Sequence, residues 1–411
     1  MPFAGRHVVL GVSGGIACYK SCTLARRLAE SGAQVDVVLT AAAGEFVRPL
    51  TFEALTGRPA LTSLWERGGS RALAHIELAK QADLVIVAPA TAHLLARAAQ
   101  GMADDLLTAL LLARSGGGGG EGEGGGPVLC APAMNDAMFA HPATRANLQT
   151  LAGRGWTFVG PESGALAEGP SELPGRMSEP ETIFAAAARL LARPGPLLGK
   201  TVLVTAGPTR EHLDPVRVIT NPSSGRMGYA LAEAAFARGA EVILVVGPTD
   251  LPLPVGAAAH RVETTAEMLR ALQTLVQRAD VLIMAAAPAD YRPAASAATK
   301  RPRSSGDLTV KLEPTPDILG SLQRPKGCVA VGFALEAGDE EGAVARARRK
   351  LQDKALDLVI LNDALEPGAG FEVATNRVTI IRDNGAPTKL PLLSKRDVAE
   401  RILDEVEQTL S

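Results

Sequence analysis

Residues able to hold phosphate are most concentrated between Val204 and Gly228, in the sequence VTAGPTREHLDPVRVITNPSSGRMG. A short apolar run, Thr201–Val204, precedes this loop, and an amphipathic segment, Tyr229–Arg238, follows it. In a strand–loop–helix unit, the free backbone N–H groups of the loop and of the helix N-terminus bind phosphate. The loop lacks a terminal Gly-Lys-Ser/Thr, so it is not a Walker loop. A surface loop rich in turn formers is the alternative, although loops this long inside compact domains are usually functional.

A second candidate phosphate loop, Ser13-Gly14-Gly15, follows the apolar run His7–Val12. A hydroxyl and two glycines at the start of a helix let a phosphate approach without obstruction by side chains. The Rossmann fingerprint is absent, because GVSGGIA lacks its third glycine at the required spacing. Taken alone, these three residues are equally consistent with a plain tight turn.

Other polar residues stand near the ends of apolar runs or on predicted helices. Asp290 could hold a ribose, a nucleobase donor or a metal, or could serve as a helix cap or loop ion pair. Lys350 and Lys354 are four residues apart, so they share one face of a helix rich in positive charge. His75 is a candidate acid or base, although a histidine beside apolar residues is more often structural. Asn135 could bind a carboxylate or cap the helix that follows.

Alternating apolar runs and helical segments predict an α/β protein with mainly parallel sheets, whose ligands lie outside the carboxyl ends of the strands. We expect strands at His7–Val12, Val35–Leu39, Leu84–Ala88, Val128–Cys130, Thr201–Val204, Glu241–Val246, Asp280–Ala285, 307–312, Val329–Phe333 and Leu358–Leu361, and a terminal strand or hairpin at 373–381. The proline- and glycine-rich stretch LARPGPLLG predicts a linker at 191–199 between domains 1–190 and 200–411.

Composition excludes several functional classes. With 411 residues, 46% apolar residues and a net charge of −2, the chain has nothing global that would attract nucleic acid or an anionic membrane. No apolar run is long enough for a membrane helix. The four cysteines show no metal-ligand spacing, which favours reduced thiols and a cytoplasmic location. The segment Ser115–Gly126, SGGGGGEGEGGG, should be a flexible surface loop because it cannot bury apolar area.

Short motifs in both halves resemble one family. The motifs TAGPTRE, DPVR and TNPSSGRMG resemble the ligase half of the bifunctional phosphopantothenoylcysteine decarboxylase/phosphopantothenate–cysteine ligases of coenzyme A biosynthesis. The motifs SGGIA, HIEL, APATA, GMADDLL, PAMN and PGRM, in this order, resemble the flavin-dependent cysteine decarboxylases. The resemblance implies a flavodoxin-like decarboxylase domain followed by a Rossmann-like ligase domain. It also implies a homo-oligomer of trimeric flavin domains and dimeric ligase domains, and a dodecamer is one such assembly.

In the first half, the resemblance implies FMN bound at subunit interfaces, where it oxidises the substrate thiol and so creates an electron sink for decarboxylation. The residues implied in FMN binding are Ser13, Gly14, Gly15, Thr40, Pro89, Ala90, Thr91 and Met102. His75 would act as base or electrostatic partner, and Asn135 would hold the substrate carboxylate. Glu168 stands where the family has a flap cysteine, and burial could raise its pKa enough for it to donate a proton. Otherwise this half would stop at the enethiol or serve as a trimeric assembly platform.

In the second half, the resemblance implies CTP and Mg²⁺, which activate 4′-phosphopantothenate as an acyl-cytidylate that cysteine then attacks. The substrate residues would be Arg217, Asn221, Ala286 and Ala287, with Asn221 also catalytic. The nucleotide residues would be Asp290, Lys300, Pro316, Asp317, Ile318, Phe333, Lys350 and Lys354. Lys300 would neutralise charge that develops on the phosphates. The metal ligands and the preference for CTP over ATP stay open.

Overall fold

The computed structural model describes residues 2–65, 73–114, 126–166, 169–192, 195–300, 308–336, 339–363 and 373–410. The chain divides into two compact units, Met1–Ala192 and Arg193–Ser411, which are considered separately below. In the described part of the chain, no helix combines the length and the apolar character needed to cross a membrane.

Unit 1 is built on a parallel five-stranded sheet in the order β2-β1-β3-β4-β5. Its strands are β1 (His7–Val12), β2 (Gln34–Leu39), β3 (Leu84–Ala90), β4 (Val128–Pro132) and β5 (Thr157–Phe158). Every residue of β3, LVIVAPA, is buried, as expected for a parallel strand covered on both faces. The order is that of flavodoxin-like folds and reverses direction between β1 and β3, which is where such folds bind ligands. The predicted flavodoxin-like first domain is therefore confirmed.

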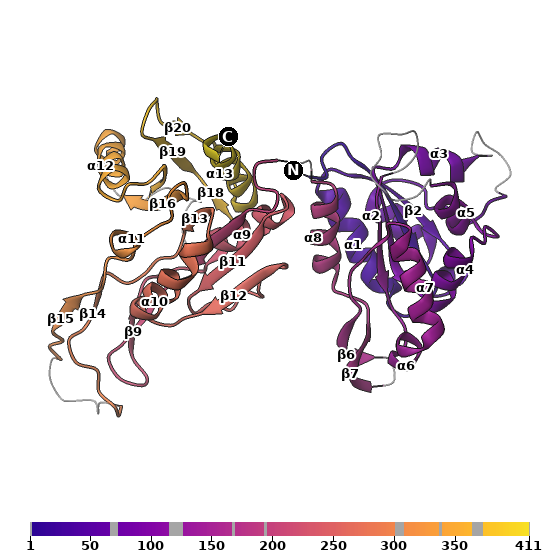
Figure 1. Ribbon diagram of the computed structural model, residues 1–411, viewed down its shortest axis with the longest axis horizontal. Coiled ribbons are helices and arrows are strands. Elements are labelled where there is room, and N and C mark those ends of the chain that lie inside the picture. Colours follow the sequence, from indigo (N-terminus) through magenta and orange to yellow (C-terminus); the bar gives the residue numbers. More distant parts are fainter. Residues whose placement is uncertain are drawn as a thin grey trace. The chain divides into compact units, whose positions relative to one another are not determined.

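Helices cover both faces of this sheet (Figure 1). The helices are α1 (Cys18–Glu30), α2 (Pro49–Thr56), α3 (Ala74–Gln81), α4 (Ala92–Gln100), α5 (Leu106–Ala113), α6 (Asp136–Ala140), α7 (Pro142–Gly153) and α8 (Pro180–Leu190), with a 3₁₀ turn at Ala43–Glu45. On one face, α3, α4, α5 and α7 share a core with the strands, whereas α1 packs with α2 and α8. An antiparallel hairpin of β6 (Glu162–Leu166) and β7 (Gly169–Arg176) completes the unit.

Unit 2 contains an eight-stranded sheet in the order β12-β11-β8-β13-β16-β17-β19-β20. Its strands are β8 (Thr201–Ala206), β11 (Glu241–Val246), β12 (Ala257–Arg261), β13 (Val281–Met284), β16 (Val329–Glu336), β17 (Leu358–Asp363), β19 (Val378–Arg382) and β20 (Thr388–Lys389). The first six strands in spatial order are parallel and follow the Rossmann arrangement, with the reversal between β8 and β13. The strands β19 and β20 extend the sheet in antiparallel fashion.

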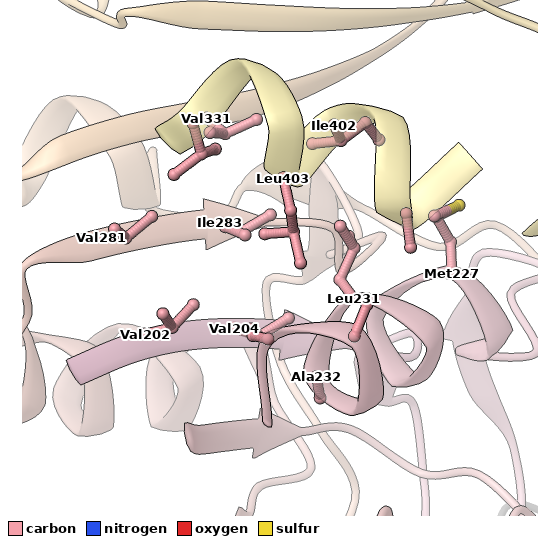
Figure 2. Close-up of a cluster of buried hydrophobic side chains, with 14 of the residues drawn as sticks. Val202, Val204, Met227, Leu231, Ala232, Val281, Ile283, Val331, Ile402 and Leu403 are labelled. Carbon is pink, nitrogen blue, oxygen red and sulfur yellow. The ribbon is translucent and has the colours of Figure 1, made fainter. Parts of the chain in front are cut away.

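The helices of unit 2 are α9 (Arg226–Ala237), α10 (Thr265–Leu275), α11 (Ile318–Ser321), α12 (Glu340–Asp353) and α13 (Lys395–Leu410), with a 3₁₀ turn at Val276–Arg278. On one face, α9 and α13 form a large buried apolar cluster with the strands. Figure 2 shows Leu403 of α13 directed towards Ile283 of β13 and Leu231 of α9. On the other face, α10 and α11 share one apolar cluster and α12 forms another. The predicted Rossmann-like domain is confirmed.

Two local expectations were wrong. The long loop after β8 is not irregular throughout, because β9 (Arg210–His212) pairs with β10 (Val218–Thr220) as an antiparallel hairpin. The strand expected at 307–312 is instead β15 (Leu312–Pro314), which pairs with β14 (Tyr291–Pro293) outside the main sheet. The strand or hairpin expected at 373–381 is present, because β19 pairs with β20 in antiparallel fashion, and it follows a short strand, β18 (Thr375–Asn376), that pairs with β21 (Leu393–Ser394).

Candidate active sites

The loop between β1 and α1 forms the first candidate site. Ser13 is 2% exposed, and its hydroxyl donates to the Pro89 carbonyl at 2.8 Å and also lies 3.2 Å from the Thr91 hydroxyl. This side chain therefore ties the end of β1 to the end of β3. Gly14 permits a close approach, since a Cβ there would lie 2.3 Å from the Cβ of Ala42. The loop is consequently fixed in place, with a glycine backbone where any larger residue would collide.

A cavity of about 630 Å³ opens beside this loop, at the reversal point of the sheet. The expected site residues on its wall are Ser13, Gly14, Gly15, Thr40, Thr91 and Asn135. Asn135 also caps α6, because its Oδ1 accepts from the backbone N–H of Ala137 at 2.8 Å. Asn135 can therefore cap α6 and also bind a carboxylate, because the cap uses only the amide oxygen and leaves the Nδ2 group to donate.

Four expected residues lie off the cavity wall as the described residues define it. Pro89 and Ala90 are buried in β3 directly behind the loop. Met102 is 48% exposed after α4, and His75 is half-buried in the first turn of α3. Within one chain, the structure does not bring Met102 and His75 to this cavity. Glu168 lies outside the described residues.

The cavity wall also carries charged or titratable residues that sequence reasoning missed, namely Lys20, His93, Arg97, Asp105 and Arg176. Lys20 is 6% exposed, and its ammonium donates to the Met177 carbonyl and to Glu179, both at 3.0 Å. A buried charge of this kind is retained only when paired. Lys20 lies in the amphipathic helix α1, and the sequence around it does not distinguish it from an ordinary surface lysine, except that it is about one to two helical turns from the phosphate loop.

The second candidate site begins where the loop after β8 enters α9. Gly225 is the N-cap of α9 at φ +77°, and no side chain caps the helix. A Cβ on Gly228 would lie 2.6 Å from the Cβ of Ala206 and 2.7 Å from the Thr205 carbonyl oxygen. Glycine therefore lets α9 pack directly on β8. The first N–H groups of α9 are directed towards the carboxyl edge of the sheet, as anion binding at a helix N-terminus requires.

The expected substrate residues meet beside this loop. Asn221 donates through Nδ2 to the Pro288 carbonyl at 2.9 Å and is 3.5 Å from the Ala287 carbonyl. The N–H groups of Ala286 and Ala287 already donate within the protein, to Thr205 and Gly207. These two alanines can consequently contact a ligand through other atoms only. Asn221 joins the loop after β8 to the segment after β13, on either side of the reversal point.

Several expected nucleotide residues cluster around the last turn of α12. Lys350 donates to the Phe333 carbonyl at 2.8 Å, and Lys354 forms an ion pair with Asp317. The pKa of Lys350 is lowered, mainly by burial, while nearby Lys354 lowers it further and the carboxylates of Glu336, Asp317 and Asp290 oppose the shift. Burial alone would raise the pKa of Asp317, but the hydrogen bond from Lys354 lowers it below its usual value.

The remaining expected nucleotide residues lie outside this group of contacts, and the segment that leads to Lys300 instead contacts the β9–β10 loop, where the N–H of Ala297 donates to the Leu213 carbonyl at 3.0 Å. Pro316 and Ile318 adjoin Asp317 at the start of α11, whereas Asp290 and Lys300 are exposed. Among the described residues, no group of three or more His, Cys, Asp or Glu side chains is arranged to hold a metal ion. The second site therefore combines a free helix N-terminus with a separate group of cations.

Comparison with known proteins identifies both halves. The Flavoprotein family matches residues 3–192, and the family described as DNA/pantothenate metabolism flavoprotein C-terminal domain matches residues 197–410. The Coenzyme A biosynthesis bifunctional protein CoaBC of Vibrio vulnificus is 45% identical over 98% of each chain. The CoaBC proteins of Bacillus subtilis and Escherichia coli K12 are 44% and 43% identical, covering 98% and 99% of this chain and 96% and 98% of theirs.

The chain belongs to the CoaBC family of bifunctional coenzyme A biosynthesis proteins. The expected family is thereby confirmed, and with it an enzyme that combines a flavoprotein decarboxylase domain with a ligase domain. Because the matches run through both halves, they favour this enzyme with two activities over an active ligase whose flavin domain serves only as a trimeric assembly platform.

Proposed function

We propose that the second half joins cysteine to 4′-phosphopantothenate through an acyl-cytidylate made from CTP. The first half then decarboxylates 4′-phosphopantothenoylcysteine to 4′-phosphopantetheine with FMN. The observation that best supports the proposed ligase reaction is the Asn221 bridge across the reversal point of the ligase sheet, beside the uncapped N-terminus of α9. We retain 1–190 and 200–411 as the proposed domain limits, and the cytoplasm as the proposed location.

The cavity of unit 1 suits FMN on two counts. Its glycine loop leaves room for a phosphate at Gly15, where a Cβ would meet nothing nearer than a methyl of Thr91 at 3.6 Å. Most of its wall consists of apolar side chains and backbone, which fits a planar ring system. The proposed binding residues are Ser13, Gly14, Gly15, Thr40, Pro89, Ala90, Thr91 and Met102. When bound, FMN supplies a two-electron acceptor for the substrate thiol.

The protein residues have separate tasks in the decarboxylation. Ser13 positions the loop, because its hydroxyl is already committed to Pro89. The Nδ2 of Asn135 is oriented by the α6 cap, which uses only Oδ1, so it can donate to a carboxylate. His75 lies off the cavity wall of its own chain, so we propose that it acts in the cavity of a second copy within a trimer.

In the ligase half, a carboxylate is a poor electrophile until a nucleotide supplies a leaving group. Asn221 and Arg217 would hold the substrate carboxylate, and Lys300 with the cations of α12 would neutralise the phosphates. Arg217 is oriented by an ion pair to the buried Asp214, at 3.4 Å. Mg²⁺ would bind chiefly through the triphosphate, which agrees with the absence of a three-ligand metal group in the described residues.

The deciding experiment follows pyrophosphate and carbon dioxide separately during turnover of 4′-phosphopantothenate, cysteine and CTP by the intact chain. Both products should form, with carbon dioxide appearing after pyrophosphate. Replacement of CTP by ATP measures nucleotide preference directly. A colourless preparation that releases no pyrophosphate from CTP with magnesium present would refute the proposal.

Glu168 requires its own test, because the family has cysteine at this position of the flap. We propose that Glu168 donates the final proton, while reduced FMN would supply the hydride, with its two electrons, that converts the enethiol to the thiol. With phosphopantothenoylcysteine as substrate, Glu168→Gln should accumulate enethiol, whereas Glu168→Cys should restore the thiol. Enethiol as the end product of the unmodified chain would show that this half stops early.

A further inference from the structure

An arginine from another segment holds the C-terminal end of α12. Arg324 lies three residues beyond α11, and its Nη2 donates to the carbonyl oxygens of Lys354 at 3.0 Å and Ala355 at 2.5 Å. Carbonyl groups in the last turn of a helix have no partner within the helix. Arg324 supplies that partner at the turn that carries Lys350 and Lys354.

This helix end needs support because of its backbone conformation. The N–H of Leu356 donates to the Leu351 carbonyl at 2.8 Å, and the N–H of Ala355 donates to the Gln352 carbonyl at 3.1 Å. These two bonds define a Schellman motif, whose left-handed position is usually glycine. Here that position is Ala355 at φ +47°, which is the only positive φ among the described non-glycine residues. An alanine in this conformation is unfavourable unless its surroundings hold it.

The segment that carries Arg324 also contacts the side chain of Lys354 directly. Asp317 pairs with the ammonium of Lys354 and caps α11 by accepting from the N–H of Gly320 at 3.1 Å. Between these residues, Leu322 is 8% exposed in the apolar cluster shared with α10. The segment 317–324 is therefore anchored in the core and contacts the C-terminal end of α12 at two groups. One is the side chain of Lys354, and the other is its backbone carbonyl.

The position of this turn also determines where Lys350 lies. Leu356 packs against Gly332, where a Cβ would lie 2.6 Å from a methyl of Leu356. Lys350 reaches the carbonyl of the next residue, Phe333, at 2.8 Å. A shift of the turn along β16 would break this packing and move the ammonium away from Phe333.

We propose that Arg324 is a positioning residue for nucleotide binding, because it fixes the last turn of α12 and so places Lys350 and Lys354. This inference rests on the proposed role of both lysines in binding CTP. Arg324 itself would not touch the nucleotide. It acts through the Lys354 and Ala355 carbonyls, and glycine at position 355 should make its hydrogen bonds less necessary.

The test measures the Kd of CTP for the full chain by calorimetry, together with ligase kinetics and the melting temperature. Arg324→Ala should weaken CTP binding about tenfold, which corresponds to about 1.4 kcal/mol, and should raise KM for CTP more than it lowers kcat. Arg349→Ala is the matched control, since it removes an exposed positive charge from the same helix without a contact to the turn. It should change Kd less than threefold.

The double variant Arg324→Ala/Ala355→Gly distinguishes positioning from a general loss of structure. Glycine adopts the left-handed conformation without strain, so the double variant should recover CTP affinity to within about threefold of the unmodified chain. Unchanged Kd in Arg324→Ala, or a loss that Ala355→Gly does not reduce, would overturn the inference. If Arg324→Ala does not fold, Arg324→Lys with and without Ala355→Gly gives the same comparison. Absence of CTP binding in the unmodified chain would instead refute the proposed ligase function.

Discussion

Replacement of Lys350 by methionine should separate nucleotide affinity from stability. Lys350 is the more buried of the two α12 lysines in the second site, and its hydrogen bond goes to the Phe333 carbonyl at 2.8 Å. Burial lowers its pKa, which means that the folded protein holds this charge at a cost. Buried charges whose pKa is shifted by desolvation are often found at functional sites, and for Lys350 the function would be binding of nucleotide phosphate.

The expected magnitudes follow from this environment. A hydrogen bond to a charged group contributes about 1.5–3 kcal/mol, so Lys350→Met should weaken CTP binding roughly ten- to a hundredfold. Methionine has a similar length and no charge, so it removes the desolvation cost and leaves only the Phe333 carbonyl without its donor. The melting temperature at neutral pH should therefore stay the same or rise slightly.

The sign of the pH dependence gives a second check. Because the folded-state pKa of Lys350 lies below its unfolded value, the unfolded state binds more protons in the window between the two. Stability should rise with pH through that window in the unmodified chain, and this rise should be smaller in Lys350→Met. The exposed Lys326→Met provides the control for loss of one positive charge. Unchanged CTP affinity in Lys350→Met, or a large fall in its melting temperature, would refute the reasoning.

Three further predictions concern other parts of the chain. Asp36→Asn should remove about 2 kcal/mol of stability at pH 7, because burial raises the pKa of Asp36 but hydrogen bonds from His7 and Arg58 outweigh it and lower the pKa to about 2. In urea titrations, the stability difference between the unmodified chain and the variant should disappear as the pH falls from about 4 to 2, and a difference that does not change with pH would contradict this prediction. Gly14→Ala should weaken FMN binding at least about tenfold through its collision with Ala42, whereas ligase activity should be preserved. Gly153→Ala, where a Cβ meets no neighbour, is the control that should leave FMN binding unchanged, and a fully yellow Gly14→Ala protein would contradict the assignment of this loop. Asn221→Asp should slow pyrophosphate release at least about tenfold and leave decarboxylation intact, and normal ligation would exclude the assigned role.

Sequence reasoning predicted the two sheets because their strands are buried on both faces. Runs such as Leu84–Ala88 and Glu241–Val246 are nearly continuous in apolar residues, and their alternation with helices requires parallel crossovers. It failed at the hairpin β9–β10, whose strands are three residues each and contain Arg210, Glu211 and His212. The strand β9 is entirely polar and β10, Val218–Thr220, has only three residues, so neither is long enough to show a period-2 apolar pattern.

From local sequence alone, candidate site residues could be predicted only where their role follows from the neighbouring residues in the chain. Gly14 and Gly225 stand at strand–helix junctions, and such junctions can be recognised from local sequence. Lys20 and Arg324 could not be found in this way, because the carbonyls that they bind belong to segments distant in sequence, such as Met177 and Lys354. Their importance depends on tertiary contacts, which a single sequence does not reveal.

Both halves divide the work of a site between two kinds of residue. Glycines such as Gly14 and Gly228 allow close packing at the reversal point of each sheet, where any Cβ would meet backbone or a neighbouring side chain. The cations nearby, including Lys20 and Lys350, come from helices and are held by carbonyl oxygens of other elements. Substitution of a glycine should therefore impair folding and binding together, because the loop has no alternative path. Substitution of Lys350 should impair binding alone, since removal of its buried charge relieves a desolvation cost, whereas loss of Lys20 would also deprive the Glu179 carboxylate of one of its cationic partners.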